Sequence, residues 1–213
     1  MKKLPIVLLI AAAQFILVGE GTAQLAKYFD RSIEQRFTVM TGASVPLGSF
    51  VQKNAIDPNA GYANMAIMGG LEYTALPLNG GIGLTASALV NSYSVSMLPG
   101  GATANRYFLL SLMAGPRFEM AISSLTPISL YSHGQIGALF SQSPDITINS
   151  ITSNGNSDLT FVASVGAGAV FDRVIDVGVR YFYTEASFGE NRLSSDAVTH
   201  IEGLQATVGF LIF

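Results

Sequence analysis

Hydrophobic residues recur at every second position in eight separate stretches of the chain. The clearest stretch is 158–171, where one parity is apolar from Leu159 to Phe171 and the other includes Thr160, Ser164 and two glycines. A period of two indicates a β-strand with two unlike faces. The predicted strands are Arg36–Leu47, Tyr62–Ala75, Gly80–Asn91, Arg106–Phe118, Pro127–Ser141, Asp158–Phe171, Ile175–Glu185 and Thr199–Phe213.

The second face of these strands distinguishes a membrane barrel from a soluble sheet. It carries Gly, Ser, Thr and Ala with few charges, whereas a face turned to water would be rich in Lys and Glu. The apolar face ends in aromatic girdles, as lipid-facing strands do. These girdles are Phe37, Tyr73, Phe118, Phe171 and Phe210 at one end and Phe108, Phe140, Phe161 and Tyr183 at the other. The pattern predicts an all-β chain, an eight-stranded antiparallel up-and-down transmembrane β-barrel.

The connections between the predicted strands alternate in length, as short periplasmic turns and long extracellular loops do in outer-membrane barrels. The long, polar connections are Gly48–Gly61, Ser92–Asn105, Gln142–Ser157 and Ala186–Val198, and the shorter ones are Leu76–Asn79, Glu119–Thr126 and Asp172–Val174. Within the third long connection, Ser143–Ser157 is rich in Ser, Asn, Ile and Thr. We expect it to extend the barrel wall as a protruding hairpin, whose edge can add a strand from a partner.

The N-terminus has the pattern of a cleavable signal peptide. Lys2 and Lys3 precede an apolar run from Leu4 to Val18, and Gly21-Thr22-Ala23 supplies small residues for cleavage. The apolar run is shorter than the roughly 20 residues that a membrane helix needs. The expected organisation is a signal peptide over residues 1–23, a periplasmic segment over 24–35 and an outer-membrane β-barrel over 36–213.

Composition agrees with export of a single domain. The chain has 213 residues, of which 49% are hydrophobic and only 12% are charged. Loss of residues 1–23 removes Lys2, Lys3 and Glu20, which changes the net charge from −3 to −4 and disfavours a nucleic-acid partner. Cysteine is absent, which excludes disulfides and thiolate metal sites. We expect no cofactor and no metal ion.

The inward face carries the polar side chains, in an interior just wide enough for side chains to fill. Four charged residues, Glu72, Arg117, Asp176 and Arg180, fall at neighbouring levels near the periplasmic end. Because an isolated buried charge is costly, we expect them to form an ionic network that plugs the lumen. A selectivity ring for a channel is the alternative. The other predicted lumen residues of this site are Tyr131, His133, Gln135 and Gln205.

Catalysis by a lipid-modifying hydrolase would require a hydroxyl nucleophile beside a histidine. Ser132 and His133 are adjacent on a strand and therefore point to opposite faces. We expect His133 to form a hydrogen bond inside the barrel with Tyr131, Gln135 or a neighbouring strand.

His200 is the better candidate for a catalytic base, since Ser194, Ser195 and Glu202 are near it in the sequence. It lies at the extracellular start of the last strand, where a solvated rim residue is the simpler interpretation. We therefore predict a protein that is not an enzyme.

Three stretches resemble strands of a known family. Gly42-Ala43-Ser44-Val45-Pro46-Leu47-Gly48-Ser49-Phe50 resembles the first strand of the small outer-membrane β-barrel domains common in Bacteroidetes-type bacteria. Leu112-Met113-Ala114-Gly115-Pro116-Arg117-Phe118 resembles the fourth, and Gly178-Val179-Arg180-Tyr181-Phe182-Tyr183 the seventh. The family's architecture is similar to that of OmpX and the transmembrane domain of OmpA. The resemblance implies a location in the bacterial outer membrane more than it implies an activity.

The C-terminal Phe213 resembles the aromatic residue that the outer-membrane assembly machinery recognises. Strict alternation turns Phe213 inward, and a β-bulge near Leu211 would be needed to turn it outward.

The expected function is binding, adhesion or envelope structure through the extracellular loops. A narrow porin-like channel is the alternative, and a lipid-modifying hydrolase is a remote one. The expected partners of this monomer are the lipid bilayer, lipopolysaccharide, the assembly machinery and an extracellular protein or surface ligand.

Overall fold

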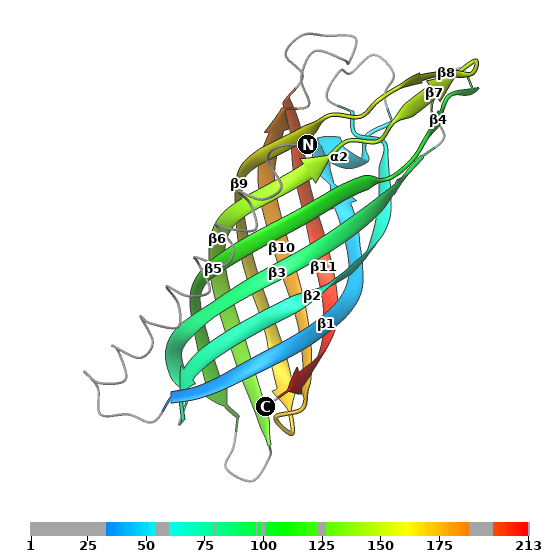
Figure 1. The fold of residues 1–213 in the computed structure, drawn as a ribbon. Helices are drawn as coiled ribbons and strands as arrows, with labels where there is room; N and C mark the ends of the chain where they lie inside the picture. Colours follow the sequence, from blue (N-terminus) through cyan, green and yellow to red (C-terminus); the bar gives the residue numbers. More distant parts are fainter. Residues whose placement is uncertain are drawn as a thin grey trace.

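The computed structural model describes residues 33–53, 60–78, 80–96, 98, 101–122, 127–187 and 198–212. Within them, eight strands close into a barrel in the order β1-β11-β10-β9-β6-β5-β3-β2, and all neighbouring strands are antiparallel (Figure 1). The strands are β1 (Ile33–Leu47), β2 (Ala63–Pro77), β3 (Gly81–Val95), β5 (Tyr107–Ala121), β6 (Ile128–Gln142), β9 (Ser157–Phe171), β10 (Ile175–Ser187) and β11 (Val198–Ile212). The predicted eight-stranded up-and-down barrel is confirmed. The predicted signal peptide lies outside the described residues.

The strand ends differ from the prediction by up to four residues. β1 begins at Ile33 rather than Arg36, and β3 continues to Val95 rather than ending at Asn91. β5 continues to Ala121, so Glu119 belongs to a barrel strand and not to the predicted turn. Pairing with β6 continues past Glu119 as far as Ala121 opposite Ser129 and extends the strand.

The outer wall of the barrel is apolar, because the exposed residues of one parity on the barrel strands include many large hydrophobic side chains. Phe161 and Val165 are 62% and 61% exposed. Strand pairing places members of one predicted aromatic girdle side by side at one end of the barrel, where Phe37 lies opposite Tyr73. Tyr73 has the outward parity but is buried, with its ring centroid 5.0 Å from that of Phe37. Such an apolar band is what lipid covers in a membrane barrel.

The two ends of the barrel differ. The turn end holds the short connections β2–β3, β5–β6 and β9–β10, whereas the loop end holds the long ones. No helix among the described residues is long and apolar enough to cross a membrane.

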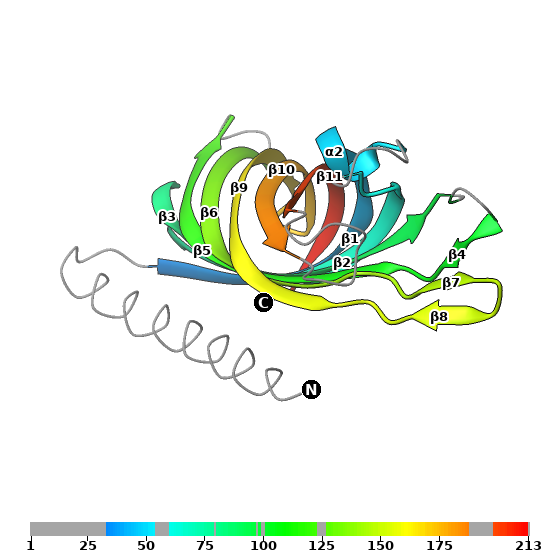
Figure 2. The ribbon, with the colours of Figure 1, turned by 90° about the horizontal axis from the view of Figure 1, so that it is seen from above.

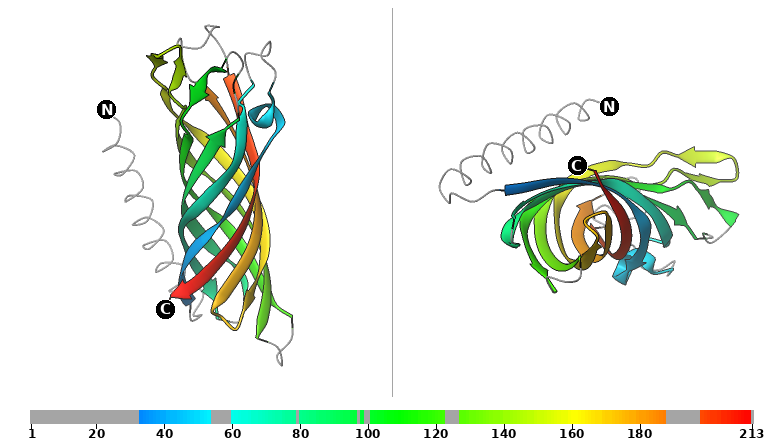
Figure 3. Two further views of the ribbon diagram at one scale, coloured as in Figure 1. Left: turned by 90° about the vertical axis from the view of Figure 1, so that its right-hand side faces the viewer. Right: turned by 90° about the horizontal axis from the view of Figure 1, so that it is seen from below.

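A second, three-stranded sheet extends the barrel wall beyond the loop end (Figures 2 and 3). It consists of β4 (Thr103–Ala104), β7 (Ile146–Ile148) and β8 (Ile151–Ser153), in the order β4-β7-β8. β4 leads into β5, β7 follows β6 and β8 leads into β9, so the sheet continues the pairing of three adjacent barrel strands. The predicted protruding hairpin is therefore present, and β4 adds to it a strand that was not predicted.

Candidate functional site

A network of charged side chains crosses the lumen near the turn end. The carboxylate of Glu72 accepts hydrogen bonds from Nη1 of Arg117 at 2.8 Å and from Nη2 of Arg180 at 2.7 Å. A second carboxylate, that of Asp176, lies 3.5 Å from Nη2 of Arg117. The guanidinium carbon of Arg117 lies 3.6 Å from the ring centroid of Tyr131. The structure thus brings together the four charged residues that the sequence places at neighbouring levels, and all four are buried.

Three further charged residues, Glu119, Arg36 and Glu34, extend this network toward the turn end, and none of them was a predicted site residue. Glu119 lies 3.1 Å from Nη2 of Arg117 through Oε2 and 2.8 Å from Nη1 of Arg36 through Oε1. Arg36 also contacts Glu34 at 2.9 Å. The parity of the sequence positions could have identified Arg36 and Glu119 as lumen residues, because Arg36 shares the inward parity of Thr38 and Glu119 shares that of Arg117. Arg36 is the first residue of its predicted strand, and Glu119 lies just beyond the predicted end of its strand, in a predicted turn.

Tyr131 and His133 stack against the inner wall beside the network. The hydroxyl of Tyr131 donates a hydrogen bond to Oδ1 of Asp176 at 2.6 Å, and the two rings have centroids 5.8 Å apart. Glycines on β9 make room for these rings. A Cβ at Gly168 would lie 2.5 Å from the Tyr131 hydroxyl, and a Cβ at Gly166 would lie 2.5 Å from Nε2 of His133. The glycine-rich inner face of β9 is therefore a steric requirement of the filled lumen.

The predicted hydrogen bond of His133 is wrong. Neither ring nitrogen has a hydrogen-bond partner among the described residues, although the side chain is buried. The ring packs parallel to Tyr131 and against Gly166, so it is held by stacking and shape. Of the other predicted lumen residues, Gln135 accepts a hydrogen bond from Ser87 at 2.9 Å. Gln205 donates one at 3.1 Å to Asn91 of β3, a strand that does not adjoin β11.

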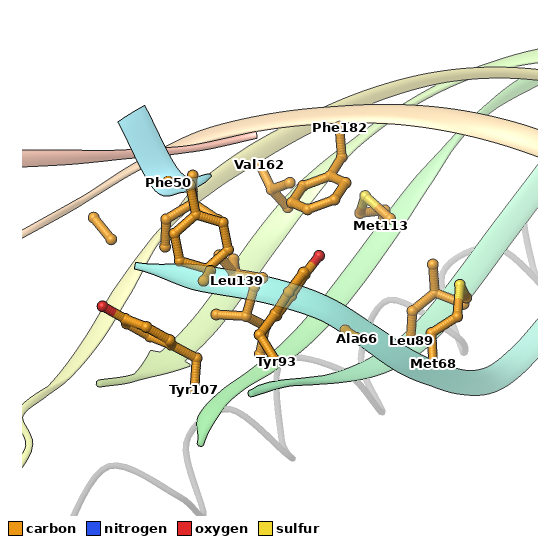
Figure 4. Close-up of a cluster of buried hydrophobic side chains, with 14 of the residues drawn as sticks. Phe50, Ala66, Met68, Leu89, Tyr93, Tyr107, Met113, Leu139, Val162 and Phe182 are labelled. Carbon is orange, nitrogen blue, oxygen red and sulfur yellow. The ribbon is translucent and has the colours of Figure 1, made fainter. Parts of the chain in front are cut away.

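An apolar cluster fills the lumen toward the loop end, and the short helix α2 (Gly48–Val51) covers it (Figure 4). Phe50 is fully buried and meets the rings of Tyr93 and Tyr107 edge to face, at centroid distances of 5.0 and 5.1 Å. The hydroxyl of Tyr107 donates to the carbonyl oxygen of Gly61 at 2.8 Å. Phe50, in the described part of the first long connection, thus packs inside the barrel, which the sequence pattern did not indicate. Other members of the cluster are Met40, Met68, Leu89, Leu109, Met113, Leu139, Val162, Phe182 and Ile201.

His200 lies on the outward face near the loop end, and its side chain is exposed. Its Nδ1 lies 3.0 Å from the hydroxyl of Tyr183 and 3.5 Å from Oε1 of Glu185. Glu202 instead accepts a hydrogen bond from a tyrosine of β10 at 2.6 Å. The candidate nucleophiles Ser194 and Ser195 lie outside the described residues. The described contacts of the His200 ring are those of a rim residue.

Phe213, the predicted assembly signal, also lies outside the described residues. β1 and β11 pair without a register shift as far as Phe37 opposite Ile212. Leu211 is buried and Ile212 is exposed, so strict alternation continues to the end of β11 and the β-bulge considered near Leu211 is not present.

Comparison with solved structures identifies the fold. Ail, the attachment invasion locus protein of Yersinia pestis, in complex with the heparin analogue sucrose octasulfate, has a TM-score of 0.50 at 16% identity, over 84% of this chain and 99% of that chain. The N-terminal β-barrel domain of Pseudomonas aeruginosa OprF has a TM-score of 0.44 at 12% identity, over 85% and 100%. The outer membrane enzyme PagL has a TM-score of 0.43 at 15% identity, over 84% and 100%. No protein-family model and no curated protein sequence matches the chain. The fold is that of the small outer-membrane β-barrels, as expected from the resemblance to OmpX and OmpA.

Proposed function

We propose that the chain is an integral outer-membrane protein that binds extracellular polypeptides by adding an extended segment to the edge of β8. The observation that carries the proposal is the three-stranded extension, in which β8 is the last strand of the sheet within the described residues. All three of its side chains are exposed, and Ile151 is 76% exposed. Edge strands of monomeric proteins are usually protected by charges, proline or a bulge, and β8 has no charge or proline.

The backbone geometry of the β7–β8 hairpin supports strand addition. Asn149 and Ser150 have φ angles of 49° and 69°, as in the two-residue turns that join antiparallel strands. Ile148 and Ile151 flank this turn and form the hydrogen-bonded pair, so the next pair, Thr147 and Thr152, is a non-hydrogen-bonded pair. The N–H and C=O groups of Thr152 therefore point to the free edge, where a partner strand can bind them.

Charge favours a polypeptide over a sulfated polysaccharide as the ligand. The structure of Ail contains a heparin analogue. A polyanion requires a cluster of Lys and Arg, but the strands β4, β7 and β8 contain neither residue.

The test is retention of vesicles carrying the full chain on surfaces coated with fibronectin, laminin, collagen or heparin. Wild-type vesicles should bind at least one protein surface, and Thr152→Pro, which removes the N–H at the free edge, should reduce retention about tenfold. Thr152→Val keeps that N–H and is the matched control, which should bind as wild type does. Binding to heparin alone, or retention that Thr152→Pro leaves unchanged, would contradict the proposal.

The filled interior favours binding over conduction. The ionic network and the apolar cluster occupy successive levels of the lumen. We therefore expect no conductance steps in planar bilayers, and stable unitary conductance would support the narrow channel instead.

A further inference from the structure

A hollow of about 660 Å³ lies against the wall of the barrel at its loop end. Its lining includes Ser92 of β3, Phe108 of β5 and Gln142 of β6. These three residues form one row across adjacent strands, because Ser92 pairs with Phe108 and Phe108 pairs with Gln142. All three have the outward parity, as has Ser94, whereas Val95 and Tyr107, which also line the hollow, have the inward parity. The exposed side chains of Phe108 and Gln142 place the opening of the hollow on the outer wall.

This row marks the level at which the apolar band ends. On β3 the last outward apolar residue is Val90, and Ser92 and Ser94 follow it. On β6, Phe140 precedes Gln142 in the same way. A boundary between apolar and polar outward residues corresponds to the headgroup region of a bilayer. Whatever enters the hollow therefore approaches it from the lipid headgroups.

Arg106 gives the hollow a positive charge. It is exposed, and it has no ion pair within the described part of the chain. The nearby carboxylate of Asp145 is already engaged, because it accepts hydrogen bonds from the side chain of Asn105 at 2.9 Å and from the N–H of Gly155 at 2.7 Å. The other described cations lie elsewhere, in the lumen, in the segment after α2 (Lys53) and at the turn end (Arg173).

We propose that this hollow binds the phosphate of lipopolysaccharide in the outer leaflet. The guanidinium of Arg106 forms charge-assisted hydrogen bonds with the phosphate, and the hydroxyls of Ser92 and Ser94 and the amide of Gln142 donate further ones. The acyl chains lie over the apolar band below, beginning at Val90. The inference goes beyond the proposed function, since it concerns the outer wall and not the edge of β8, and it shares with that proposal only the location in the outer membrane.

The test is native mass spectrometry of the folded full chain in detergent micelles, titrated with bisphosphorylated lipid A. Arg106→Gln should weaken binding about tenfold or more, because the charge-assisted hydrogen bonds to the phosphate are lost. Arg173→Gln, which changes an exposed arginine at the opposite end, should bind as wild type does. Heat-modifiable electrophoretic mobility checks that both variants are folded.

Three ligands distinguish the sources of phosphate. Dephosphorylated lipid A should bind wild type at least as weakly as lipid A binds Arg106→Gln, since it loses the contacts of Ser92, Ser94 and Gln142 as well. Phosphatidylglycerol should bind more weakly than lipid A, and millimolar sodium phosphate should not displace lipid A. Equal loss in Arg106→Gln and Arg173→Gln, displacement by free phosphate, or equal affinity for phosphatidylglycerol would overturn the assignment. Thr152→Pro should leave the affinity for lipid A unchanged, so this proposal and the one on β8 can fail separately.

Discussion

At the scale of single residues, Glu72 is the centre of the buried charge network. Its two carboxylate oxygens bind arginines from β5 and β10, which lie on separate parts of the barrel wall. Glu119 and Asp176 share Arg117 with it, but Arg180 has no other acidic partner among the described residues. Removing the charge of Glu72 therefore leaves Arg180 buried without a counter-charge.

We expect Glu72→Gln to lower the free energy of unfolding by up to about 3 to 5 kcal/mol, the range for breaking a buried ion pair. Urea unfolding in lipid vesicles, followed by heat-modifiable mobility, measures the change. Adding Arg117→Met should increase the loss, because Asp176 then has no cationic partner among the described residues and Arg180 stays uncompensated.

Glu34→Gln is the matched control for Glu72→Gln. The side chain of Glu34 is 13% exposed, against 2% for Glu72, and its partner Arg36 keeps Glu119. The control should therefore lose much less stability. Equal losses in the two variants would show that burial of the network contributes little.

At the scale of elements, the barrel strands are longer than a bilayer requires. They have 13 to 15 residues, whereas about 9 to 11 tilted residues cross the hydrocarbon core. The loop ends of the strands, together with β4, β7 and β8, therefore project beyond the lipid. Replacing an exposed apolar residue by a charged one should therefore affect folding differently in the projecting part and in the apolar band.

Val165→Arg and Ile151→Arg test this difference, since both replace an exposed apolar side chain. Val165 lies in the apolar band of β9, and a cation at that depth costs about 2 to 4 kcal/mol. Ile151 lies in the extension, where we expect arginine to be tolerated. The yield of heat-modifiable protein after folding into vesicles measures both effects. Comparable failure of the two variants would contradict the placement of the band.

At the scale of the whole molecule, closure of the barrel sets the orientation. β1 pairs with β11 so that Phe37 lies opposite Ile212, which puts the start of the first strand and the end of the last at the turn end. All the long connections consequently leave from the opposite end. If the chain is exported and inserted as proposed, the extension faces the medium and the short turns face the periplasm.

Single cysteines report this orientation without background, because the chain contains none. Thr103→Cys and Asn154→Cys, in or beside the extension, should react with a membrane-impermeant maleimide on intact cells. Arg173→Cys, in the β9–β10 turn, should react only after the outer membrane is permeabilised. The reverse pattern would mean that the barrel is inserted the other way round.

The sequence by itself determined the eight strands, their two faces and the levels of the four predicted charges. These features follow from period-two alternation, which is a local property of the backbone and is enforced here by unlike surroundings on the two faces. Arg36 and Glu119 share the inward parity but were not predicted as site residues, and Glu119 was placed in a turn. The ends of strands depend on pairing with a neighbour and not on local pattern. Glu119 was therefore not recognised as a site residue, because the predicted strand ended at Phe118 and β5 continues to Ala121.

Only the tertiary structure decided how the lumen is closed and which groups meet in it. Phe50 enters the barrel because Tyr93 and Tyr107, on two other strands, provide a surface for it. His133 stacks on Tyr131 without a hydrogen bond because Gly166, on the adjacent strand, leaves room for the ring but offers no polar side chain. β4 joins the extension through pairing with β7, some forty residues further along the chain. Each of these contacts joins residues far apart in the sequence, and their meeting depends on the register of strands around the closed barrel, which no local pattern contains.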